Sequence, residues 1–533
     1  MNHRFVIYFI GKLLQILSLL FLVPAAIAWY ETSGTFWERV LDPALAGLLF
    51  SIIFSSVTGT IFVFTQRKNK GKIEVREGFA IVTFGWLALT FAGSFPLFIY
   101  FLSLYETLSA GKVIAAFTDA FFEVMSGLTT TGATILTDIE AVPQGILFWR
   151  SLTHWIGGMG IVTLALALLP TFGVAAYQLF RGEVPGPSKE RLRPKLAQTA
   201  IILWGVYALF TLIQTVLLMF GDMSLYDAVL HAFSTMSTGG FSTKNTSVAA
   251  FNSAYIEWVI ILFMFLAGTN FLIHYRLLFL RDLNMIKSNR EFHLYTAIVI
   301  TAVFICITAL SIQGLQPRSE IERHFRAQEL TEEQVDLKIM VEEEKIKPLG
   351  ARVRHSFFNA LAIITTTGFV SADWDTWPDS VRVVFMILMF FGGSAGSTAG
   401  GIKMIRVLVL FKVAIHQVKL ILQPRLVSPV KIGKVALSDS QMSGIISFFI
   451  IFMVLFVFFT AIMSTMIPDF TTSVSVVAAT LGNIGPGLSG VGAMENYAWI
   501  PLPGKWILTL CMLLGRLEIY TVLIAFSRIS WRK

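Results

Sequence analysis

Charged side chains are scarce in this sequence of 533 residues. Asp, Glu, Lys and Arg make up 14% of the chain and hydrophobic residues 55%, whereas a soluble domain averages about 25% charged residues. The mean hydropathy is +0.72, and the apolar residues occur in long blocks. This composition excludes a large water-exposed surface and predicts a polytopic membrane protein.

Cysteine is nearly absent. Cys306 and Cys511 both lie within apolar runs, which excludes a disulfide framework and a cysteine metal site and predicts buried packing. Four histidines share no ligand spacing: His154, His231, His274 and His355. We therefore expect no metal site of this kind and no covalently bound cofactor, and His231 is expected to be a packing residue.

Enzyme signatures are also missing. We expect no HExxH motif, no nucleophile elbow and no paired carboxylates inside apolar segments, so an intramembrane enzyme is not predicted. A P-loop and a GxGxxG motif after a strand are absent as well. Any nucleotide sensing would therefore have to come from a partner protein.

Long apolar segments are what the chain does have. About 20 apolar residues cross a bilayer as a helix, and ten segments qualify, approximately 9–30, 43–65, 78–102, 146–170, 197–220, 254–280, 293–314, 381–415 (interrupted), 441–467 and 504–527. The first lacks a small-residue cleavage pattern, so we expect an uncleaved span and not a signal peptide. The prediction is an all-α membrane protein with ten transmembrane helices.

The loops between these segments separate by charge. One set is basic: Arg67, Lys68, Lys70, Lys72, Arg76, Arg181, Lys189, Arg191, Arg193, Lys195, Arg281, Lys287, Arg290, Lys412, Lys419, Arg425, Lys431, Lys434, Arg528, Arg532 and Lys533. The other set is acidic: Glu31, Glu38, Asp138, Glu140, Asp373, Asp375, Asp379 and Glu495. Basic loops stay in the cytoplasm, so both termini are predicted to be cytoplasmic, and the net charge of +8 needs no nucleic-acid partner. The segments 181–195 and 424–434 could meet anionic lipid headgroups or a cytosolic protein.

One polar stretch, Gln316 to Gly350, interrupts this pattern. It is rich in both signs of charge and lies outside by the span count. We expect a partly helical surface excursion there.

After the first two spans, the other eight form pairs, and each pair brackets a related fifteen-residue window. The windows are Asp119 to Ala133 (DAFFEVMSGLTTTGA), Asp227 to Phe241 (DAVLHAFSTMSTGGF), His355 to Phe369 (HSFFNALAIITTTGF) and Thr472 to Pro486 (TSVSVVAATLGNIGP). Each opens with a polar residue able to cap a helix, continues through about two apolar turns and has Gly as its fourteenth member. Four copies in the same topological place indicate an internal fourfold repeat.

The windows are too short to span a membrane, which makes them candidates for re-entrant segments. Irregular backbone at membrane depth is tolerated only where it is buried in protein or lines a watery cavity. A short helix that enters from outside points its negative C-terminal end at the membrane centre, and the extended residues after it present carbonyls that can replace the hydration shell of a cation. Glycine permits the required dihedrals, and threonine hydroxyls add oxygen ligands.

These four windows, the two additional N-terminal spans and the run Gly515-Arg516-Leu517-Glu518-Ile519-Tyr520 resemble TrkH/TrkG, within the Trk/Ktr/HKT superfamily of potassium transporters. Ktr-type subunits usually lack the two extra spans, so the Trk side is favoured. The resemblance implies two extra N-terminal helices in 1–70, followed by four pseudo-symmetric helix–pore loop–helix repeats. The repeats are 71–180, 181–285, 286–434 (with the insertion and an interrupted second helix) and 435–533.

The resemblance also implies a potassium selectivity filter formed by Thr130, Thr131, Gly132, Thr238, Gly239, Gly240, Thr366, Thr367, Gly368, Asn483, Ile484 and Gly485. Members that prefer sodium often carry serine at the first filter glycine, so glycine in all four copies implies potassium. The fourth copy departs most, because Asn483 and Ile484 replace hydroxyl residues, and the ring is not expected to be truly fourfold.

Ten small residues, 392–401, interrupt the eighth span and cannot hold a membrane helix. The resemblance implies an intramembrane gating loop with Gly392, Gly393, Gly396, Gly400 and Gly401, although small residues also permit close helix packing. Arg516 lies near the middle of the last predicted span, where a charge indicates function. The resemblance makes it an electrostatic barrier or an anchor of the loop; a structural ion pair with another span is the alternative.

The resemblance further implies an inner-membrane homodimer in the lipid bilayer, docked on a TrkA-type cytosolic nucleotide-binding regulatory subunit, with K⁺ as substrate. A cation secondary symporter, K⁺/Na⁺- or H⁺-coupled, is the alternative. Inverted repeats typical of such transporters are not predicted, because all four windows re-enter from the same side.

Overall fold

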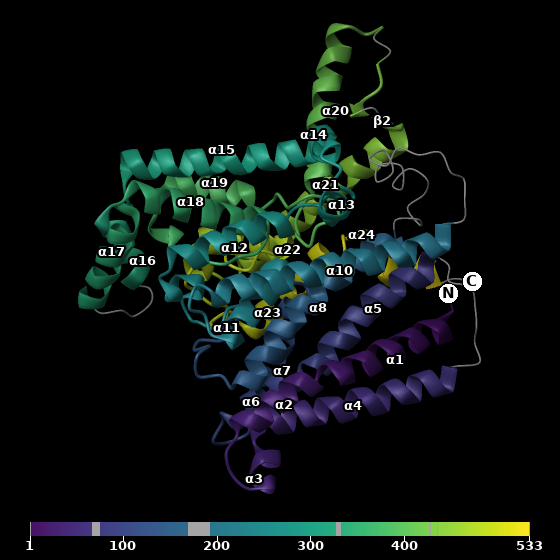
Figure 1. Cartoon of the computed structure of the whole chain (residues 1–533), viewed down its shortest axis with the longest axis vertical. Helices are drawn as coiled ribbons and strands as arrows, with labels where there is room; N and C mark the ends of the chain where they lie inside the picture. The colour runs from purple at the N-terminus through teal and green to yellow at the C-terminus, as the bar shows by residue number, and fades with distance from the viewer. Residues whose placement is uncertain are drawn as a thin grey trace.

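The computed structural model describes residues 2–66, 75–168, 192–326, 332–425, 428–433 and 435–531. These residues form helices almost throughout, with one antiparallel hairpin of two-residue strands, β1 (Lys431–Ile432) and β2 (Val435–Ala436). Figure 1 shows a bundle of long helices that run roughly alongside one another. The predicted all-helical class is confirmed for this part of the chain.

The N-terminal unit contains α1 (His3–Leu20), α2 (Leu22–Glu31), α3 (Phe36–Leu41) and α4 (Pro43–Gln66). Helices α1 and α4 cross closely because Gly11 and Gly59 face each other. A Cβ atom on Gly11 would stand 2.9 Å from the carbonyl oxygen of Gly59. Small residues at such a crossing permit the backbone contact that holds membrane helices together.

Four further units follow one plan, a helix, a short helix and a second helix. The first contains α5 (Val75–Gly93), α6 (Phe95–Ser103), α7 (Ala110–Leu128) and α8 (Gln144–Leu168), and the second α10 (Leu192–Met219), α11 (Leu225–Met236), η1 (Ser247–Phe251), α12 (Ala254–Ala267), α13 (Phe271–Leu280) and α14 (Asn284–Ser288). The third contains α15 (Arg290–Gln313), α16 (Arg318–Arg326), α17 (Glu332–Ile346), α18 (Leu349–Ile364), η2 (Trp374–Thr376), α19 (Asp379–Leu388) and α20 (Met404–Leu422). The fourth contains α21 (Asp439–Met463), α22 (Phe470–Gly482), η3 (Ser489–Val491), α23 (Leu502–Arg516), α24 (Tyr520–Phe526) and α25 (Arg528–Trp531).

Membrane-spanning helices are fewer by length and composition than the ten predicted. Within the described residues six helices are long and apolar enough, or up to eight if each of two bent pairs counts as one span. The predicted spans 254–280 and 504–527 are not continuous, since the chain bends by 101° between α12 and α13 and by 113° between α23 and α24. The first bend has a local cause: Asn270 Oδ1 accepts from the Leu272 amide, 2.8 Å away, and so caps a new helix.

The second bend falls at Glu518 and Ile519, whose φ angles are +56° and +32°. Positive φ ends a right-handed helix, because an L-residue cannot continue it there. Arg516 is therefore the last residue of α23, and not the middle of an unbroken span as predicted. The interrupted span 381–415 has the expected break, between Leu388 and Met404.

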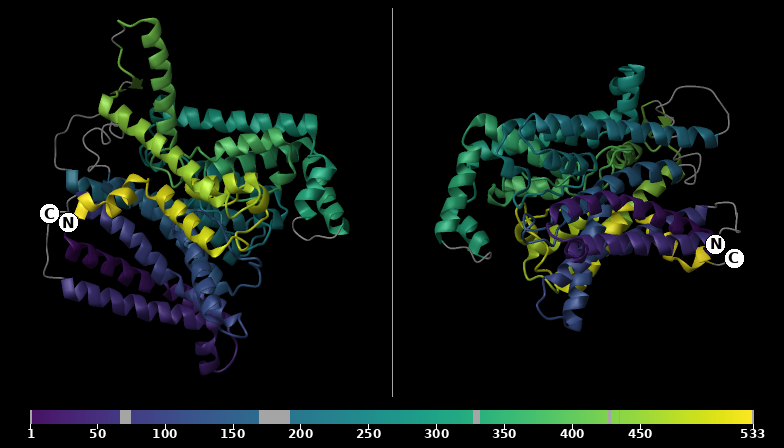
Figure 2. Two further views of the ribbon diagram at one scale, coloured as in Figure 1. Left: turned by 180° about the vertical axis from the view of Figure 1, so that it is seen from behind. Right: turned by 60° about the horizontal axis from the view of Figure 1, so that its bottom comes forward.

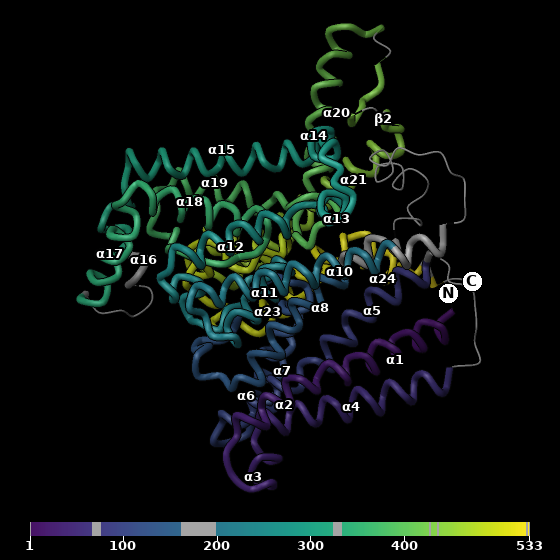
Figure 3. The backbone as a smooth tube through the Cα atoms, in the orientation of Figure 1, coloured from purple at the N-terminus to yellow at the C-terminus, as the bar shows by residue number. Residues whose placement is uncertain are grey.

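The two chain ends lie at the same end of the bundle, and α16 and α17 lie at the opposite end in every view (Figure 1, Figure 2). The tube in Figure 3 shows the same separation. Helices α16 and α17 confirm the partly helical excursion at 316–350. Their small core is Ile321, Val335 and Ile339, and Glu342 accepts from the Asp373 amide at 3.2 Å, which fastens α17 to the body.

Both cysteines are buried and unpaired, as predicted. The predicted basic residues Arg67, Lys68, Lys70, Lys72, Arg181, Lys189, Arg191, Lys434, Arg532 and Lys533 lie outside the described residues. The predicted unit boundaries at 70/71 and 180/181 also lie outside them.

Candidate functional site

The four short helices α7, α11, α18 and α22 end in the same backbone motif. The twelfth residue of each window has a positive φ: Thr130 (+50°), Thr238 (+56°), Thr366 (+56°) and Asn483 (+56°). The amide of the following residue then bonds the carbonyl five residues back, at 2.8 Å in every copy. This is the left-handed helix ending of a Schellman type, here without its usual glycine.

The predicted starts of these helices are wrong in all four copies. Asp119, Asp227, His355 and Thr472 lie inside their helices, which begin at Ala110, Leu225, Leu349 and Phe470. Ser109 and Ser224 supply the caps of α7 and α11 by accepting amide hydrogen bonds. In the fourth copy the cap is Asp469, three residues before the window. The repeat was recognisable from its C-terminal end, whereas the capping residues lie outside it.

The fourteenth residues, Gly132, Gly240, Gly368 and Gly485, also have positive φ angles of +84°, +81°, +70° and +97°. Each glycine faces the carbonyl oxygen of the thirteenth residue in the next unit. The facing pairs are Gly132 with Gly239, Gly240 with Thr367, Gly368 with Ile484, and Gly485 with Thr131. The last pair returns to the first unit, so the four windows form a closed ring in chain order.

A Cβ atom on any of the four glycines would stand closer than 3.0 Å to that carbonyl oxygen. Such an approach cannot be relieved by a side-chain rotation, because the obstacle is backbone. The ring therefore brings the carbonyls of Thr131, Gly239, Thr367 and Ile484 together at the C-terminal, negative ends of four helices. All twelve residues predicted for the filter belong to these four turns.

A cavity of about 60 Å³ opens on the ring. Its lining includes all four glycines, together with Thr134, Arg150, Ser242, Val370, Pro486 and Tyr497. Carbonyl oxygens at a negative helix end are hard ligands that suit a dehydrated monovalent cation. The arrangement can therefore hold such an ion without a carboxylate.

Threonine hydroxyls in the ring are largely used for internal contacts. The Thr131 and Thr367 hydroxyls each pair with the threonine two residues earlier, at 2.8 Å. The Thr238 hydroxyl donates to the Ser237 carbonyl, and that of Thr366 accepts from the Gly400 amide at 2.7 Å. The hydroxyls therefore stabilise the turns, and the backbone carbonyls are the main candidate ligands.

Asn483 explains how the divergent fourth copy still fits. Asparagine adopts positive φ more readily than most residues. Its side-chain amide donates to the Thr131 hydroxyl at 3.0 Å and to the Met512 carbonyl at 2.9 Å. It therefore joins the fourth turn to the first and to α23.

The segment 389–403, between α19 and α20, lies against the ends of these helices. The Thr398 hydroxyl donates to the Met236 carbonyl at the end of α11, 3.0 Å away, and the Gly400 amide reaches Thr366. At Gly393 and Gly400 a Cβ atom would meet the backbone of Gly268 and Gly482. The predicted loop residues Gly392, Gly396 and Gly401 belong to the same segment, in which Gly396 accepts from the Phe271 amide at 3.1 Å.

Arg516 is buried and holds this segment through backbone carbonyls. It donates to the Thr398 carbonyl at 2.7 Å and to the Gly157 carbonyl at 3.2 Å. Glu518 bonds Arg406, 2.6 Å away, as expected from its position on another face. Within the described residues no salt bridge forms at Arg516, so the structural ion pair is not found there.

The segment 392–396 spells G-x-S-x-G, the nucleophile-elbow pattern, contrary to our expectation that the sequence has none. An elbow needs a serine at a strand-to-helix turn with a base beside it. Ser394 lies in a loop between two helices, and its hydroxyl has no hydrogen-bond partner among the described residues. The G-x-S-x-G pattern is therefore present without the strand-to-helix turn of a nucleophile elbow.

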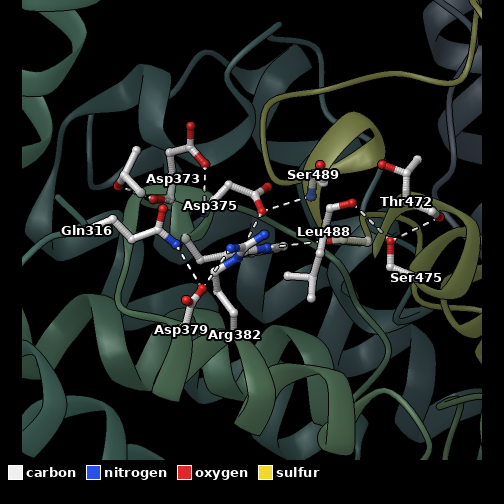
Figure 4. A network of polar contacts seen from close by, with 12 residues as sticks. Gln316, Asp373, Asp375, Asp379, Arg382, Thr472, Ser475, Leu488 and Ser489 are labelled. Atoms are coloured by element: carbon white, nitrogen blue, oxygen red, sulfur yellow. Dashed lines mark hydrogen bonds and ion pairs between the residues drawn. The ribbon is translucent and has the colours of Figure 1, made fainter. Parts of the chain in front are cut away.

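Polar residues outside the windows also contribute, and their pairing was not predicted from the sequence. Figure 4 shows a network behind the third and fourth turns, in which Asp375 accepts from the Ser489 amide at 2.9 Å and Ser475 donates to the Leu488 carbonyl at 2.9 Å. Arg382 lies 3.7 Å from Asp375 and donates to Asp379 at 2.9 Å. The network ties the loops after the third and fourth turns together.

Asp375 predicts a pH dependence of stability. Burial, reinforced by Glu495, raises the pKa of Asp375 to about 6 despite Ser489 and Arg382. The folded state then binds this proton more tightly than the unfolded state, so stability falls as pH rises through the interval from about 4 to 6. We expect the melting temperature of the purified protein to fall less between pH 5 and 7.5 in Asp375→Asn than in the wild type.

Asp379→Asn is the matched control, because its carboxylate bonds the same arginine but is 71% exposed. Its pH profile should follow the wild type. Equal slopes for Asp375→Asn and the wild type would contradict the assignment.

Comparison with known proteins agrees with this architecture. The sequence model of the TrkH family, described as cation transport protein, matches residues 46–532. The chain is 35% identical over its full length, and the full length of the relative, to the Trk system potassium uptake protein TrkH of Salmonella typhimurium. It is 31% identical to TrkG of Escherichia coli over 99% of both chains.

A solved structure is similar as well. The crystal structure of the potassium transporter TrkH from Vibrio parahaemolyticus superposes with a TM-score of 0.81, at 30% identity and with both chains fully covered. A full-length match at this level shows common descent as well as a common fold. The chain belongs to the TrkH family of cation transport proteins.

Proposed function

We propose that this chain is the ion-conducting, channel-like subunit of a Trk-type potassium uptake system. The observation that carries the proposal is the closed ring, in which each glycine of one turn faces the carbonyl oxygen of the next turn. Four helix ends of negative polarity converge there, and the cavity beside the ring gives access from one side. The names of the TrkH and TrkG relatives support potassium as the substrate.

Potassium selectivity in this proposal comes from the ring. The ion loses its water to the carbonyls of Thr131, Gly239, Thr367 and Ile484, with the turns 130–132, 238–240, 366–368 and 483–485 as the filter. K⁺ is hydrated more weakly than Na⁺. A ring of carbonyl oxygens therefore replaces the hydration shell of K⁺ more completely than that of Na⁺. Glycine at the fourteenth position of each window supports K⁺ over Na⁺, and no enzymatic step is involved.

The gate is the segment 389–403 in this proposal. It lies against the helix ends that surround the ring, and Arg516 tethers it through the Thr398 carbonyl. A fixed guanidinium near the pathway also opposes the passage of a cation. Movement of this segment would open the pathway on its inner side.

Orientation follows from the charge pattern and the chain ends. We assign both termini and α20 to the cytoplasm and α16–α17 to the outside, in the inner membrane, because the basic loops accompany the termini. A homodimer docked on a TrkA-type nucleotide-binding subunit completes the proposal. The absence of a nucleotide-binding motif in this chain supports the need for such a partner.

Complementation tests the function. We would express the chain, with and without a TrkA-type subunit, in a bacterial strain that lacks its own potassium uptake systems. We expect growth at low external potassium and rubidium uptake that K⁺ inhibits and Na⁺ does not. Absence of rescue with the regulatory subunit present would contradict the proposal, and uptake that requires a Na⁺ or proton gradient would favour the symporter.

A further inference from the structure

Each short helix carries, near the middle of its window, a polar side chain that bonds the loop after its own turn. His231 bonds the Ser242 hydroxyl at 2.9 Å, Asn359 donates to the Ala372 carbonyl at 3.2 Å, and Ser475 donates to the Leu488 carbonyl. In the first unit Glu123 has this place. It accepts from the Thr134 hydroxyl at 2.8 Å and from the Ile135 amide at 2.9 Å.

Glu123 differs from the other three because it is a carboxylate paired with a cation. Arg150 of α8 donates to it at 2.6 Å, and the side chains are 0% and 2% exposed. Removing two charges from water costs several kcal/mol each unless geometry and extra hydrogen bonds compensate. Buried ionic groups at membrane depth therefore indicate function more strongly than stability.

Arg150 extends the contact to the second unit. It donates to the Ser242 carbonyl at 3.0 Å, and its guanidinium carbon lies 3.5 Å from the centre of the Phe241 ring. His154, one turn further along α8, stacks on the same ring at 3.9 Å. Phe241 directly follows Gly240, so α8 holds the second turn through its side chain and its backbone.

The pair therefore joins two neighbouring turns of the ring. Glu123 fixes the loop that leaves Gly132, and Arg150 fixes the loop that leaves Gly240. The two loops set where the carbonyls of Thr131 and Gly239 stand. Arg150 also lines the cavity beside the ring, where its charge would repel a cation if Glu123 did not balance it.

We propose that Glu123 and Arg150 are positioning residues of the ion pathway, which hold the first and second turns at the spacing needed to discriminate K⁺ from Na⁺. This inference rests on the proposed function. It assigns one part of the ion selectivity to the contact between the first and second units. The pair contributes geometry and local neutrality, and neither residue is a ligand of the ion.

Selectivity is the readout, since a purely structural pair would change the amount of folded protein and leave the ratio of ion fluxes unchanged. We would measure initial rates of rubidium and sodium uptake in the potassium-uptake-deficient strain and divide both by the folded protein found by size-exclusion chromatography. The variants are Glu123→Gln, Arg150→Lys and Thr134→Val. The last keeps both charges and the side-chain volume but removes one bond to Glu123, together with the bond that the Leu136 amide donates to the Thr134 hydroxyl at 3.1 Å.

For Glu123→Gln and Arg150→Lys we expect the Rb⁺/Na⁺ rate ratio to fall about tenfold, which corresponds to about 1.4 kcal/mol. Thr134→Val should lower it in the same direction by a smaller factor, and it decides the question if the charge variants do not fold. Glu140→Gln is the matched control: it breaks an ion pair between the same two units, with Lys244 at 3.0 Å, that is 34% and 46% exposed. Its ratio should equal that of the wild type.

An unchanged ratio in every folded variant, with the wild type active, would overturn the positioning role and leave the proposed function standing. An inactive wild type would instead contradict the proposed function. A ratio that falls equally in Glu140→Gln would also overturn the inference, because the effect would then not belong to the buried pair.

Discussion

Gly240→Ala and Gly368→Ala are each expected to reduce rubidium uptake by about a hundredfold or more, since misplacement of reacting or binding groups by about 1 Å has effects of this size. Alanine adds one carbon, and at both positions that carbon overlaps a carbonyl oxygen of the next turn, Thr367 or Ile484. The carbonyl must move, and the ring that would hold the ion opens. Uptake in the potassium-uptake-deficient strain, corrected for folded protein, checks the prediction.

Gly314→Ala separates this overlap from backbone strain. Gly314 has φ of +68°, close to that of Gly368, and nothing lies within 4 Å of a Cβ placed there. Its ψ of −146° places it in a backbone region almost confined to glycine, so alanine should cost about 1–3 kcal/mol of stability and leave uptake unchanged. Normal uptake in both Gly240→Ala and Gly368→Ala would show that the ring is not part of the ion pathway.

The ring could be predicted from the C-terminal end of each window, where the geometry of the turn dictates the residue type. The turn needs glycine at the fourteenth position, because a carbonyl of the next unit occupies the place of a side chain. That requirement leaves a visible pattern in all four copies. Starts of the same helices were mispredicted, because Ser109 and Ser224 cap them from loops that differ between units.

Other features left no local pattern. The bends after Ala267 and Arg516 interrupt segments whose average hydropathy is that of a membrane span, so hydropathy alone predicted continuous spans. Partners such as Glu123 with Arg150, 27 residues apart, or Asp375 with Ser489, 114 apart, meet only in the folded chain. The carboxylate partner of Arg150 could therefore not be predicted from spacing.

Asymmetry of the ring follows from these partners. The fourth turn has no hydroxyl at its twelfth or thirteenth position, and Asn483 compensates by bonding Thr131. The ion pair of Glu123 and Arg150 joins the first and second units. Between the third and fourth units, the Trp374 indole instead donates to the Gly487 carbonyl at 3.2 Å. The backbone is thus nearly fourfold, and the side chains that support it differ in every unit.

Arg516→Gln is expected to raise rubidium uptake measured without the regulatory subunit by about tenfold or more. The variant removes a charge that Glu518 does not balance, because Glu518 pairs with Arg406. Two unit charges about 8 Å apart interact by about 2 kcal/mol at an effective dielectric constant of about 20, which is about thirtyfold in rate. The variant also weakens the bonds to the Thr398 and Gly157 carbonyls, which frees the segment 389–403.

Arg516→Lys separates the two contributions, since it keeps the charge but cannot reach two carbonyls with a planar fork. High uptake in both variants would assign the closed state to the tether, whereas high uptake in Arg516→Gln alone would assign it to the charge. Uptake at the wild-type level in both, with the protein folded, would show that Arg516 does not restrain the pathway. In that case the segment 389–403 would be held closed by the hydrogen bonds of the Thr398 hydroxyl and the Gly400 amide, and these would be the next groups to change.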